Sequence, residues 1–245
     1  MYYINMQTSL LIYSFRFTYI FLLTTGAITF IEALRSPIPT VRHILNLETC
    51  ISIIASYFYG LFLTELEKVD TTKDKDKDKD KDKDKDKDQS INELPLEKIN
   101  TMRYTDWFIT TPFMLLALSM ILAYENNHKV KFLPYLLVLF SNFFMLFFGY
   151  IGDIGMLNKF IANIIGFIFI HITYITIWIQ FMRGSKITLQ SKIIFWLSYG
   201  LWCLYGVFHL MNEIHKNLGY NILDLLTKAV MGIFFWLYLT KSIIF

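Results

Sequence analysis

The chain has 245 residues, of which 55% are hydrophobic and 18% aromatic, whereas a typical soluble domain is about 45–50% apolar. The net charge is only +3 and the basic residues form no patch of the nucleic-acid-binding type, so the composition excludes nucleic acid as a partner and indicates a lipid bilayer as the surroundings. The chain also has no metal-ligand cluster, phosphate-binding loop or nucleophile motif, so we expect neither a metal site nor an enzyme.

Seven apolar segments are long enough to be membrane helices, which need about 20 mostly apolar residues each. We therefore predict an all-α membrane protein, in which residues 1–245 form one seven-helix bundle. Lys and Arg are concentrated in the connections after the first, third and fifth segments, which places the N-terminus outside the cell and the C-terminus in the cytoplasm. The predicted segments are residues 9–34, 44–65, 101–124, 132–151, 160–182, 189–211 and 220–244.

The second segment carries a stripe of polar residues on an otherwise apolar helix. Ser52, Ser56 and Tyr59 follow Glu48 at helical spacing, which places all four residues on one face. One interpretation is a seam of small polar residues between packed helices. The other interpretation is a path for cations that begins at the charge of Glu48.

The connection after the second segment, residues 66–98, is dominated by a Lys-Asp repeat at residues 73–88. A run of alternating charges without apolar residues has nothing to bury, so we predict a solvated, disordered loop. We interpret the repeat as a tolerated expansion. Weak binding of divalent cations by its aspartates is the alternative, and the neighbouring lysines would oppose it.

The third segment holds charged residues that a membrane interior tolerates only with a partner or a function. Arg103, Asp106 and Thr110 share one helical face, and Pro112 interrupts the helix hydrogen bonds nearby. We expect Asp106 to accept a hydrogen bond from Thr110 and Arg103 to compensate the charge of Asp106. A polar seam between packed helices is the alternative.

The sixth segment carries an aromatic stripe, in which Trp202, Tyr205 and His209 recur at helical spacing. Such a stripe is common in plain helix packing. Together with Trp107 of the third segment, it would also form walls around an elongated apolar ligand. His209 is either a satisfied core histidine or a contact to an outward proton path.

The seventh segment places Lys228 in its middle, where insertion of a lysine costs about 2.5–3.5 kcal/mol. Burial favours the neutral amine, which can condense with an aldehyde to form an imine. Asp224 lies one helical turn earlier on the same face, so an ordinary buried ion pair is the alternative. The positive charges of Lys228 and Arg103 balance the negative charges of Asp106 and Asp224, which suggests that the four residues form one buried quartet. A protein core does not need such a charged group for stability.

Three of these segments resemble the microbial rhodopsin family. The pattern Arg-Tyr-x-Asp-Trp-x-x-Thr-Thr-Pro at residues 103–112 is similar to the counterion helix of that family, and Asp-x-x-x-Lys at residues 224–228 is similar to its retinal attachment site. Trp202 and Tyr205 resemble its aromatic pocket, although Gly206 stands where the family usually has proline.

The resemblance implies that Lys228 carries all-trans retinal as a protonated Schiff base, which light isomerises. Asp106 is then the primary counterion and proton acceptor, and Asp224 is the second counterion. Arg103 and Thr110 belong to the counterion network. The aromatic residues implied to clamp the polyene are Trp107, Trp202 and Tyr205.

One position departs from the outward proton pumps of the family, which usually have a carboxylate seven residues after the conserved threonine. Here this position is Ala117, so the usual proton donor is missing and reprotonation is expected to be slow. Residues 24–35 and 48–59 resemble the rhodopsins of large algal viruses, some of which are light-gated cation channels. We therefore interpret the chain as such a channel, with an ion path along Glu48, Ser52, Ser56 and Tyr59.

Two other functions stay open at this stage. The first is a light-driven outward proton pump, for which the pair of Asp106 and Thr110 and the second carboxylate Asp224 are present. The second is a photosensor that signals through a partner protein. The expected partners are retinal, the lipid bilayer, monovalent cations or protons, and further copies of the chain in a homo-oligomer. The expected location is the plasma membrane or another host-cell membrane.

Overall fold

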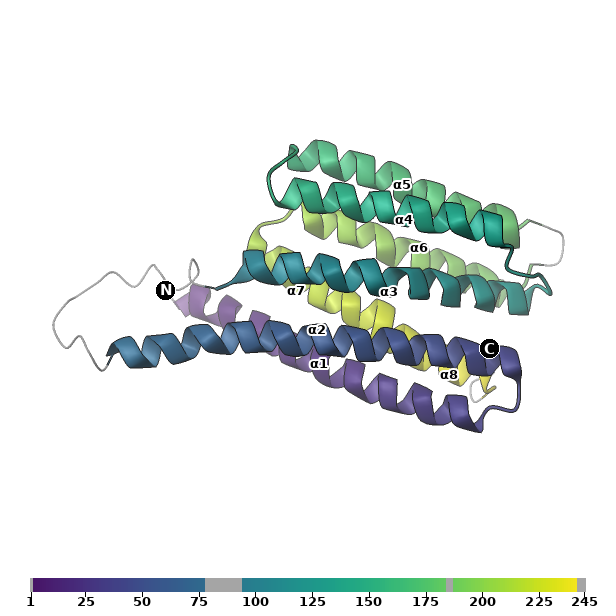
Figure 1. The fold of residues 1–245 in the computed structure, drawn as a ribbon, viewed down its shortest axis with the longest axis horizontal. Helices are drawn as coiled ribbons and strands as arrows, with labels where there is room; N and C mark the ends of the chain where they lie inside the picture. The colour runs from purple at the N-terminus through teal and green to yellow at the C-terminus, as the bar shows by residue number, and fades with distance from the viewer. Residues whose placement is uncertain (1, 78–93, 184–186, 242–245) are drawn as a thin grey trace.

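The computed structural model describes residues 2–77, 94–183 and 187–241, and every regular element in these ranges is a helix. The helices lie side by side as one bundle (Figure 1). They are α1 Tyr2–Arg35, α2 Pro39–Lys77, α3 Leu96–Glu125, α4 Phe132–Asp153, α5 Lys159–Phe181, α6 Leu189–His209, α7 Glu213–Asp224, η2 Leu225–Val230 and α8 Met231–Leu239.

The last three elements follow one another without a break, so the described residues contain seven candidate membrane spans of 21 to 30 residues. This confirms the prediction of an all-α, seven-helix, multi-pass membrane protein. The orientation of the two termini relative to the membrane stays a prediction from the basic loop residues.

The outer surface of the bundle is apolar, which accounts for the composition. On α4, for example, Phe132, Leu133 and Phe140 are 79%, 75% and 59% exposed. A soluble protein would bury such side chains, whereas a lipid bilayer solvates them. The third span, in contrast, lies deep in the bundle: 56% of its most apolar window is buried, compared with 22% for α4. Arg103, Asp106 and Thr110 on α3 are buried and therefore face other helices.

The prediction of a disordered loop over residues 66–98 was wrong at both ends. Helix α2 continues to Lys77, and α3 already begins at Leu96. Charged residues can continue a helix beyond the membrane because the helix satisfies its own backbone hydrogen bonds. Glu65 also bonds to Lys68 one turn later, at 2.6 Å, and to Lys98 of α3, at 2.8 Å. Residues 78–93, which include most of the repeat, lie outside the described residues.

We name the two ends of the bundle after charged residues near them. The Arg103 end contains the beginning of α3 and of α7 and the end of α6, and it lies on the side of the N-terminus in Figure 1. The Glu48 end contains the beginning of α2 and the ends of α1 and α3. In the predicted orientation the Arg103 end faces outside.

Candidate functional site

The centre of the site is an ion pair that joins the third and seventh spans. Lys228 is 1% exposed, and its Nζ donates a hydrogen bond to Asp106 Oδ2 at 2.6 Å. The nearest oxygen of Asp224 is 3.7 Å from the same nitrogen. Lys228 lies in η2, a short π-helical stretch, and such stretches are frequent at functional sites because they change the direction of a side chain locally.

Asp106 has one oxygen that is not used by the protein. Its Oδ1 is buried without a hydrogen-bond partner among the described residues. We expected Thr110 to donate to this carboxylate, but the Thr110 hydroxyl donates instead to the backbone carbonyl of Asp106, at 2.9 Å. A threonine inside a helix readily makes this bond to the carbonyl one turn earlier. The free oxygen can therefore accept a proton or a water molecule.

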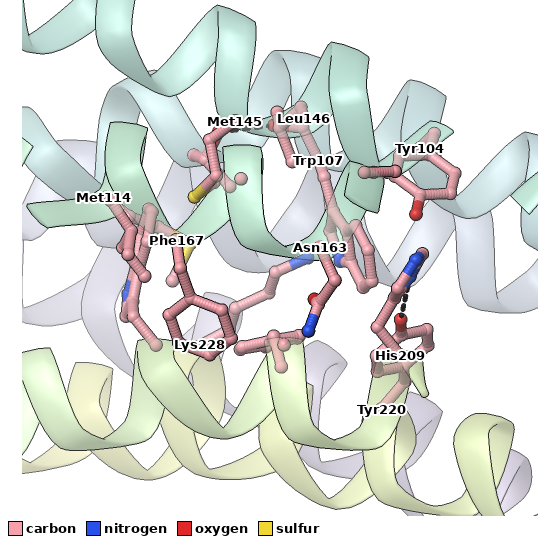
Figure 2. A pocket seen from close by; sticks show the side chains of 18 residues that line it. Tyr104, Trp107, Met114, Met145, Leu146, Asn163, Phe167, His209, Tyr220 and Lys228 are labelled. Carbon is pink, nitrogen blue, oxygen red and sulfur yellow. Dashed lines mark hydrogen bonds between the residues drawn. The ribbon is translucent and has the colours of Figure 1, made fainter. Parts of the chain in front are cut away.

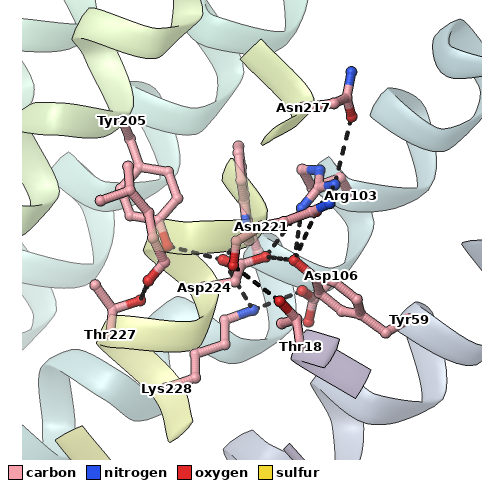
Figure 3. Close-up of polar contacts among 12 residues, drawn as sticks. Thr18, Tyr59, Arg103, Asp106, Tyr205, Asn217, Asn221, Asp224, Thr227 and Lys228 are labelled. Atoms are coloured by element: carbon pink, nitrogen blue, oxygen red, sulfur yellow. Dashed lines mark hydrogen bonds and ion pairs between the residues drawn. The ribbon is translucent and has the colours of Figure 1, made fainter. Parts of the chain in front are cut away.

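Asp224, in contrast, is surrounded by donors (Figure 3). Its two oxygens accept hydrogen bonds from four side chains on three spans other than its own, and the carboxylate is fully buried. A buried charge needs such partners because its desolvation is otherwise costly. The donors are Tyr205 OH at 2.8 Å, Tyr59 OH at 2.9 Å, Arg103 NH1 at 3.1 Å and Trp107 Nε1 at 3.2 Å.

Arg103 pairs with Asp224 and not, as we expected, with Asp106. Its second terminal nitrogen donates to Asn221 Oδ1 at 2.7 Å and to Asn217 Oδ1 at 3.4 Å. The four charges therefore form two short pairs, which the longer contact between Lys228 and Asp224, at 3.7 Å, connects. Sequence reasoning missed both asparagines, although they precede Asp224 at helical spacing on the seventh span. Five rings surround the guanidinium at 5.1 to 6.0 Å: Phe15, Tyr59, Phe62, Trp107 and Tyr220.

An apolar cavity lies beside the amine of Lys228 (Figure 2). The three aromatic residues expected in the ligand walls, Trp107, Trp202 and Tyr205, all line it. Sequence reasoning missed most of the remaining wall residues because they come from α4 and α5, whose sequences are mostly apolar and show no pattern that sets the wall residues apart. The cavity is also lined by Tyr104, Thr111, Met114, Met145, Leu146, Gly149, Ala162, Asn163, Gly166, Phe167, Ile170, Gly206, His209 and Tyr220.

Gly206 shapes one wall of this cavity. A Cβ atom at this position would lie 2.6 Å from two ring atoms of Phe167. We expect Gly206→Ala to push Phe167 into the cavity and to destabilise the protein by about 1–3 kcal/mol, as overpacking usually does. Gly200→Ala on the same helix is the matched control, because its added Cβ would meet nothing within 4 Å. Thermal denaturation of the two variants measures the difference, and equal melting temperatures would contradict the prediction.

Glu48 lies buried on the opposite side of Trp202. It is 3% exposed and lines a second, smaller cavity together with Trp202, Thr227 and Met231. Trp202 and Met114 line both cavities and so lie between Glu48 and the apolar cavity beside Lys228. Gly232, one turn after Lys228, leaves the room for the carboxylate: a Cβ there would lie 3.1 Å from Glu48 Oε2.

The polar stripe on the second span is buried along its whole length. Ser52 and Ser56 are 0% and 3% exposed, and the Ser52 hydroxyl has no hydrogen-bond partner in the described ranges. The Ser56 hydroxyl donates to the backbone carbonyl of Ile53 at 2.8 Å. The stripe ends at Tyr59, which belongs to the cluster around Asp224. It thus connects the neighbourhood of Glu48 with the Arg103 end of the bundle.

The sequence pattern of a family described as bacteriorhodopsin-like protein matches residues 9–242. Among solved structures, the crystal structure of viral rhodopsin OLPVRII is 38% identical, with a TM-score of 0.80, and the match covers 96% of this chain and 100% of that chain. The structure of blue light-absorbing proteorhodopsin from Med12 has a TM-score of 0.70 at 20% identity, over 95% of this chain and 98% of that chain, and so supports the fold alone.

A green-light absorbing proteorhodopsin from Gamma-proteobacterium EBAC31A08 is 28% identical over 151 residues. That match covers 55% of this chain and 59% of the relative, so the similarity spans less than two thirds of the relative's length.

Proposed function

Because the chain belongs to the bacteriorhodopsin-like protein family, we propose that it binds retinal through Lys228 and uses light to move protons across the membrane. The observation that carries this proposal is the 2.6 Å contact between Lys228 Nζ and Asp106 Oδ2, with a free carboxylate oxygen and an apolar cavity beside it. The members of this family are retinal-binding membrane proteins that transport ions or sense light.

The residues around the cavity fit retinal. The polyene is apolar and elongated, and the walls are almost entirely apolar or aromatic, with the single amine of Lys228 among them. Trp107, Trp202 and Tyr205 would hold the polyene, and Lys228 Nζ would bond to its aldehyde carbon; we expect the all-trans isomer in the dark. When bound, retinal supplies the absorption of visible light and an isomerisation that redirects the proton on Nζ.

Asp106 is the proton acceptor in this proposal. Its carboxylate touches Lys228 Nζ, and its Oδ1 is free to take a proton. Asp224 is less suited, because its oxygens already accept four hydrogen bonds, one of them from Arg103. Proton uptake by Asp224 would break this arrangement, whereas proton uptake by Asp106 neutralises the pair that it forms with Lys228.

Glu48 is the proton donor in this proposal and takes the place of the carboxylate that is missing at Ala117. It lines a cavity with Met114 and Leu118, which flank position 117 on the third span. Trp202 and Met114 line both this cavity and the one that Lys228 lines, so one layer of side chains separates the two. A carboxyl group in this place can return a proton to Nζ from the Glu48 end, so net transport runs from the Glu48 end to the Arg103 end.

A light-gated cation channel is the second candidate, and the buried stripe of Glu48, Ser52, Ser56 and Tyr59 favours it. The stripe offers oxygen ligands along the second span. At its end, however, the Tyr59 hydroxyl is bonded to Arg103 and Asp224. Protons can pass along hydrogen-bonding groups in such a packed interior, whereas hydrated cations need a wider path and would have to separate these groups. This supports proton transfer over a channel.

Recording light-evoked current under voltage clamp tests the proposal. Cells that make the protein are supplied with all-trans retinal and measured at several voltages and at two sodium gradients. A proton pump gives a current of one direction at every voltage, and the current does not depend on sodium. A current that reverses its sign at a potential set by the sodium gradient would contradict proton pumping and support the channel.

We expect Glu48→Gln to slow the return of the pigment to its dark state by about 10²-fold, because a positioned acid or base typically contributes 10²–10⁴. Glutamine keeps the size of the side chain and removes the proton. Flash spectroscopy measures the rate. Ser52→Ala is the control. If the protein transports protons, this variant should return to its dark state at the wild-type rate. If Ser52 lines a cation path, the variant should instead alter the light-evoked current. An unchanged rate in Glu48→Gln would exclude Glu48 as donor.

A further inference from the structure

A second buried ion cluster lies at the Arg103 end, apart from the pairs around Lys228. Its centre is Lys216, which is 1% exposed and whose Nζ lies 3.1 Å from Asp153 Oδ1 and 2.8 Å from Glu213 Oε1. The Asp153 side chain is 5% exposed, and its Oδ2 accepts a hydrogen bond from Tyr104 OH at 3.1 Å. Asp153 is the last residue of α4, yet the beginning of the seventh span buries it.

His209, the last residue of α6, connects this cluster with the apolar cavity. It is 4% exposed and lines the cavity that Lys228 also lines. Its Nδ1 lies 3.4 Å from Tyr220 OH and 3.7 Å from Asp153 Oδ1. Its Nε2 is buried without a hydrogen-bond partner among the described residues. A histidine that serves packing alone would normally have both ring nitrogens satisfied.

Tyr104 is the wall between two cavities. It lines the apolar cavity together with His209 and Tyr220, and Figure 2 shows the three side chains gathered at one end of that pocket. It also lines a polar cavity, which we call the vestibule, together with Asp153 and Glu213. The Glu213 side chain is 51% exposed, so the vestibule reaches the surface of the protein.

These contacts form a chain of groups that can exchange protons. Tyr220 packs against Trp107, with ring centroids 4.9 Å apart, and so begins the chain at the apolar cavity beside Lys228. His209 and Asp153 continue it to the vestibule. Among the described residues, Arg103 hydrogen-bonds to Tyr59, Asp224, Asn217 and Asn221 and to none of the members of this chain, although the ring of Tyr220 lies 5.6 Å from its guanidinium.

We propose that His209 relays the transported proton from Tyr220 to Asp153 and thus provides an exit route that bypasses Arg103. The inference rests on the proposed proton transport. The proton that Asp106 releases reaches Tyr220 on a hydronium ion, which protonates the Tyr220 oxygen while the Tyr220 O–H proton passes to His209 Nδ1, so that neutral water and a neutral tyrosine remain. The Nδ1–H bond then breaks as the proton passes to Asp153, and the imidazole is neutral again. Asp153 lies beside the ammonium groups of Lys216 and Lys159, which repel positive charge, so the proton leaves to vestibule water.

The test follows proton release after a laser flash with a pH-indicator dye. We expect His209→Phe and His209→Gln to slow the appearance of the proton in solution by about tenfold. Loss of an acid–base group typically slows a proton transfer by about 10²–10⁴, but here the route past Arg103 remains and limits the effect. His209→Gln keeps a hydrogen-bonding side chain, so it separates the relay from packing. Imidazole added to the His209→Gln protein should restore fast release, which a purely structural role would not allow.

His171→Phe supplies the control, because His171 lies within α5, is exposed and bonds to the carbonyl of Phe167. It should release protons as the wild type does. If the wild type transports protons but the His209 variants release them at the wild-type rate, the relay is wrong and the proposed function stands. If the wild type forms pigment but transports no protons, the proposed function itself is wrong.

Discussion

The Lys228→Arg variant is expected to form no pigment when all-trans retinal is added. Removal of the positive charge beside Asp106 would leave a buried carboxylate without a partner and destabilise the protein by about 3–5 kcal/mol. Arginine keeps a positive charge at this position and so avoids that cost. A guanidinium stays protonated in proteins and does not condense with an aldehyde as a lysine amine does. Visible absorption spectroscopy of the protein with retinal measures the result directly, and the loss should be complete.

Lys216→Arg is the matched control for this experiment. Lys216 is also 1% exposed and also forms buried ion pairs, but it does not line the apolar cavity beside Lys228. This variant should form pigment to the wild-type level, whatever its effect on proton release. Borohydride reduction of the wild-type pigment, followed by mass spectrometry of its peptides, locates the retinyl group. Pigment in Lys228→Arg, or a retinyl group on Lys216, would show that the attachment site has been assigned wrongly.

The helices and the residues that face the interior could be predicted from the sequence because both depend on local patterns. Apolar segments of sufficient length predicted the seven spans, and helical spacing placed Arg103, Asp106 and Thr110 on one face. A lysine and an aspartate in the middle of an apolar segment must face other helices, since lipid does not solvate them. The observed burial of Asp224 and Lys228 follows from this argument alone.

The pairing of the charges could not be predicted, because it depends on the heights and rotations of different helices relative to one another. Charge balance suggested one quartet, and the structure does connect the four groups, through the short pairs Lys228 with Asp106 and Arg103 with Asp224 and the longer contact between Lys228 and Asp224. Which carboxylate forms the short contact with Lys228 matters chemically. The observed arrangement leaves Asp106 with a free oxygen and holds Asp224 in place with four donors.

The burial of charged residues at helix ends could not be predicted from the sequence, for a related reason. Asp153 and Lys216 lie near the ends of their spans, where charges usually face water. The ends of α4, α6 and the seventh span converge at this place, so both side chains are buried. No spacing within one segment reveals such a convergence. The same holds for Glu48, whose neighbour Gly232 comes from a helix nearly 200 positions away in the chain.

We expect Asp106→Asn to form pigment but to lose proton transport. Asparagine keeps the shape of the side chain and removes both the proton acceptor and the negative charge beside Lys228 Nζ. The absorption should move to longer wavelength, because the lost negative charge no longer stabilises the positive charge at Nζ in the ground state. The light-evoked proton current, divided by the amount of pigment, should fall at least about 10²-fold, as expected for a missing acid–base group.

Asp224→Asn distinguishes the two carboxylates. It removes the charged partner of the buried Arg103, which should lower the free energy of unfolding by about 3–5 kcal/mol. The melting temperature of the protein should fall accordingly. The pigment that does form should still transfer protons, because Asp106 and its free oxygen are intact. If Asp106→Asn pumped normally, or if Asp224→Asn abolished transport per pigment to the same extent, the two carboxylates would not have the separate roles that their geometry supports. Asp224 would then share the acceptor function, and the four charges would act as one unit.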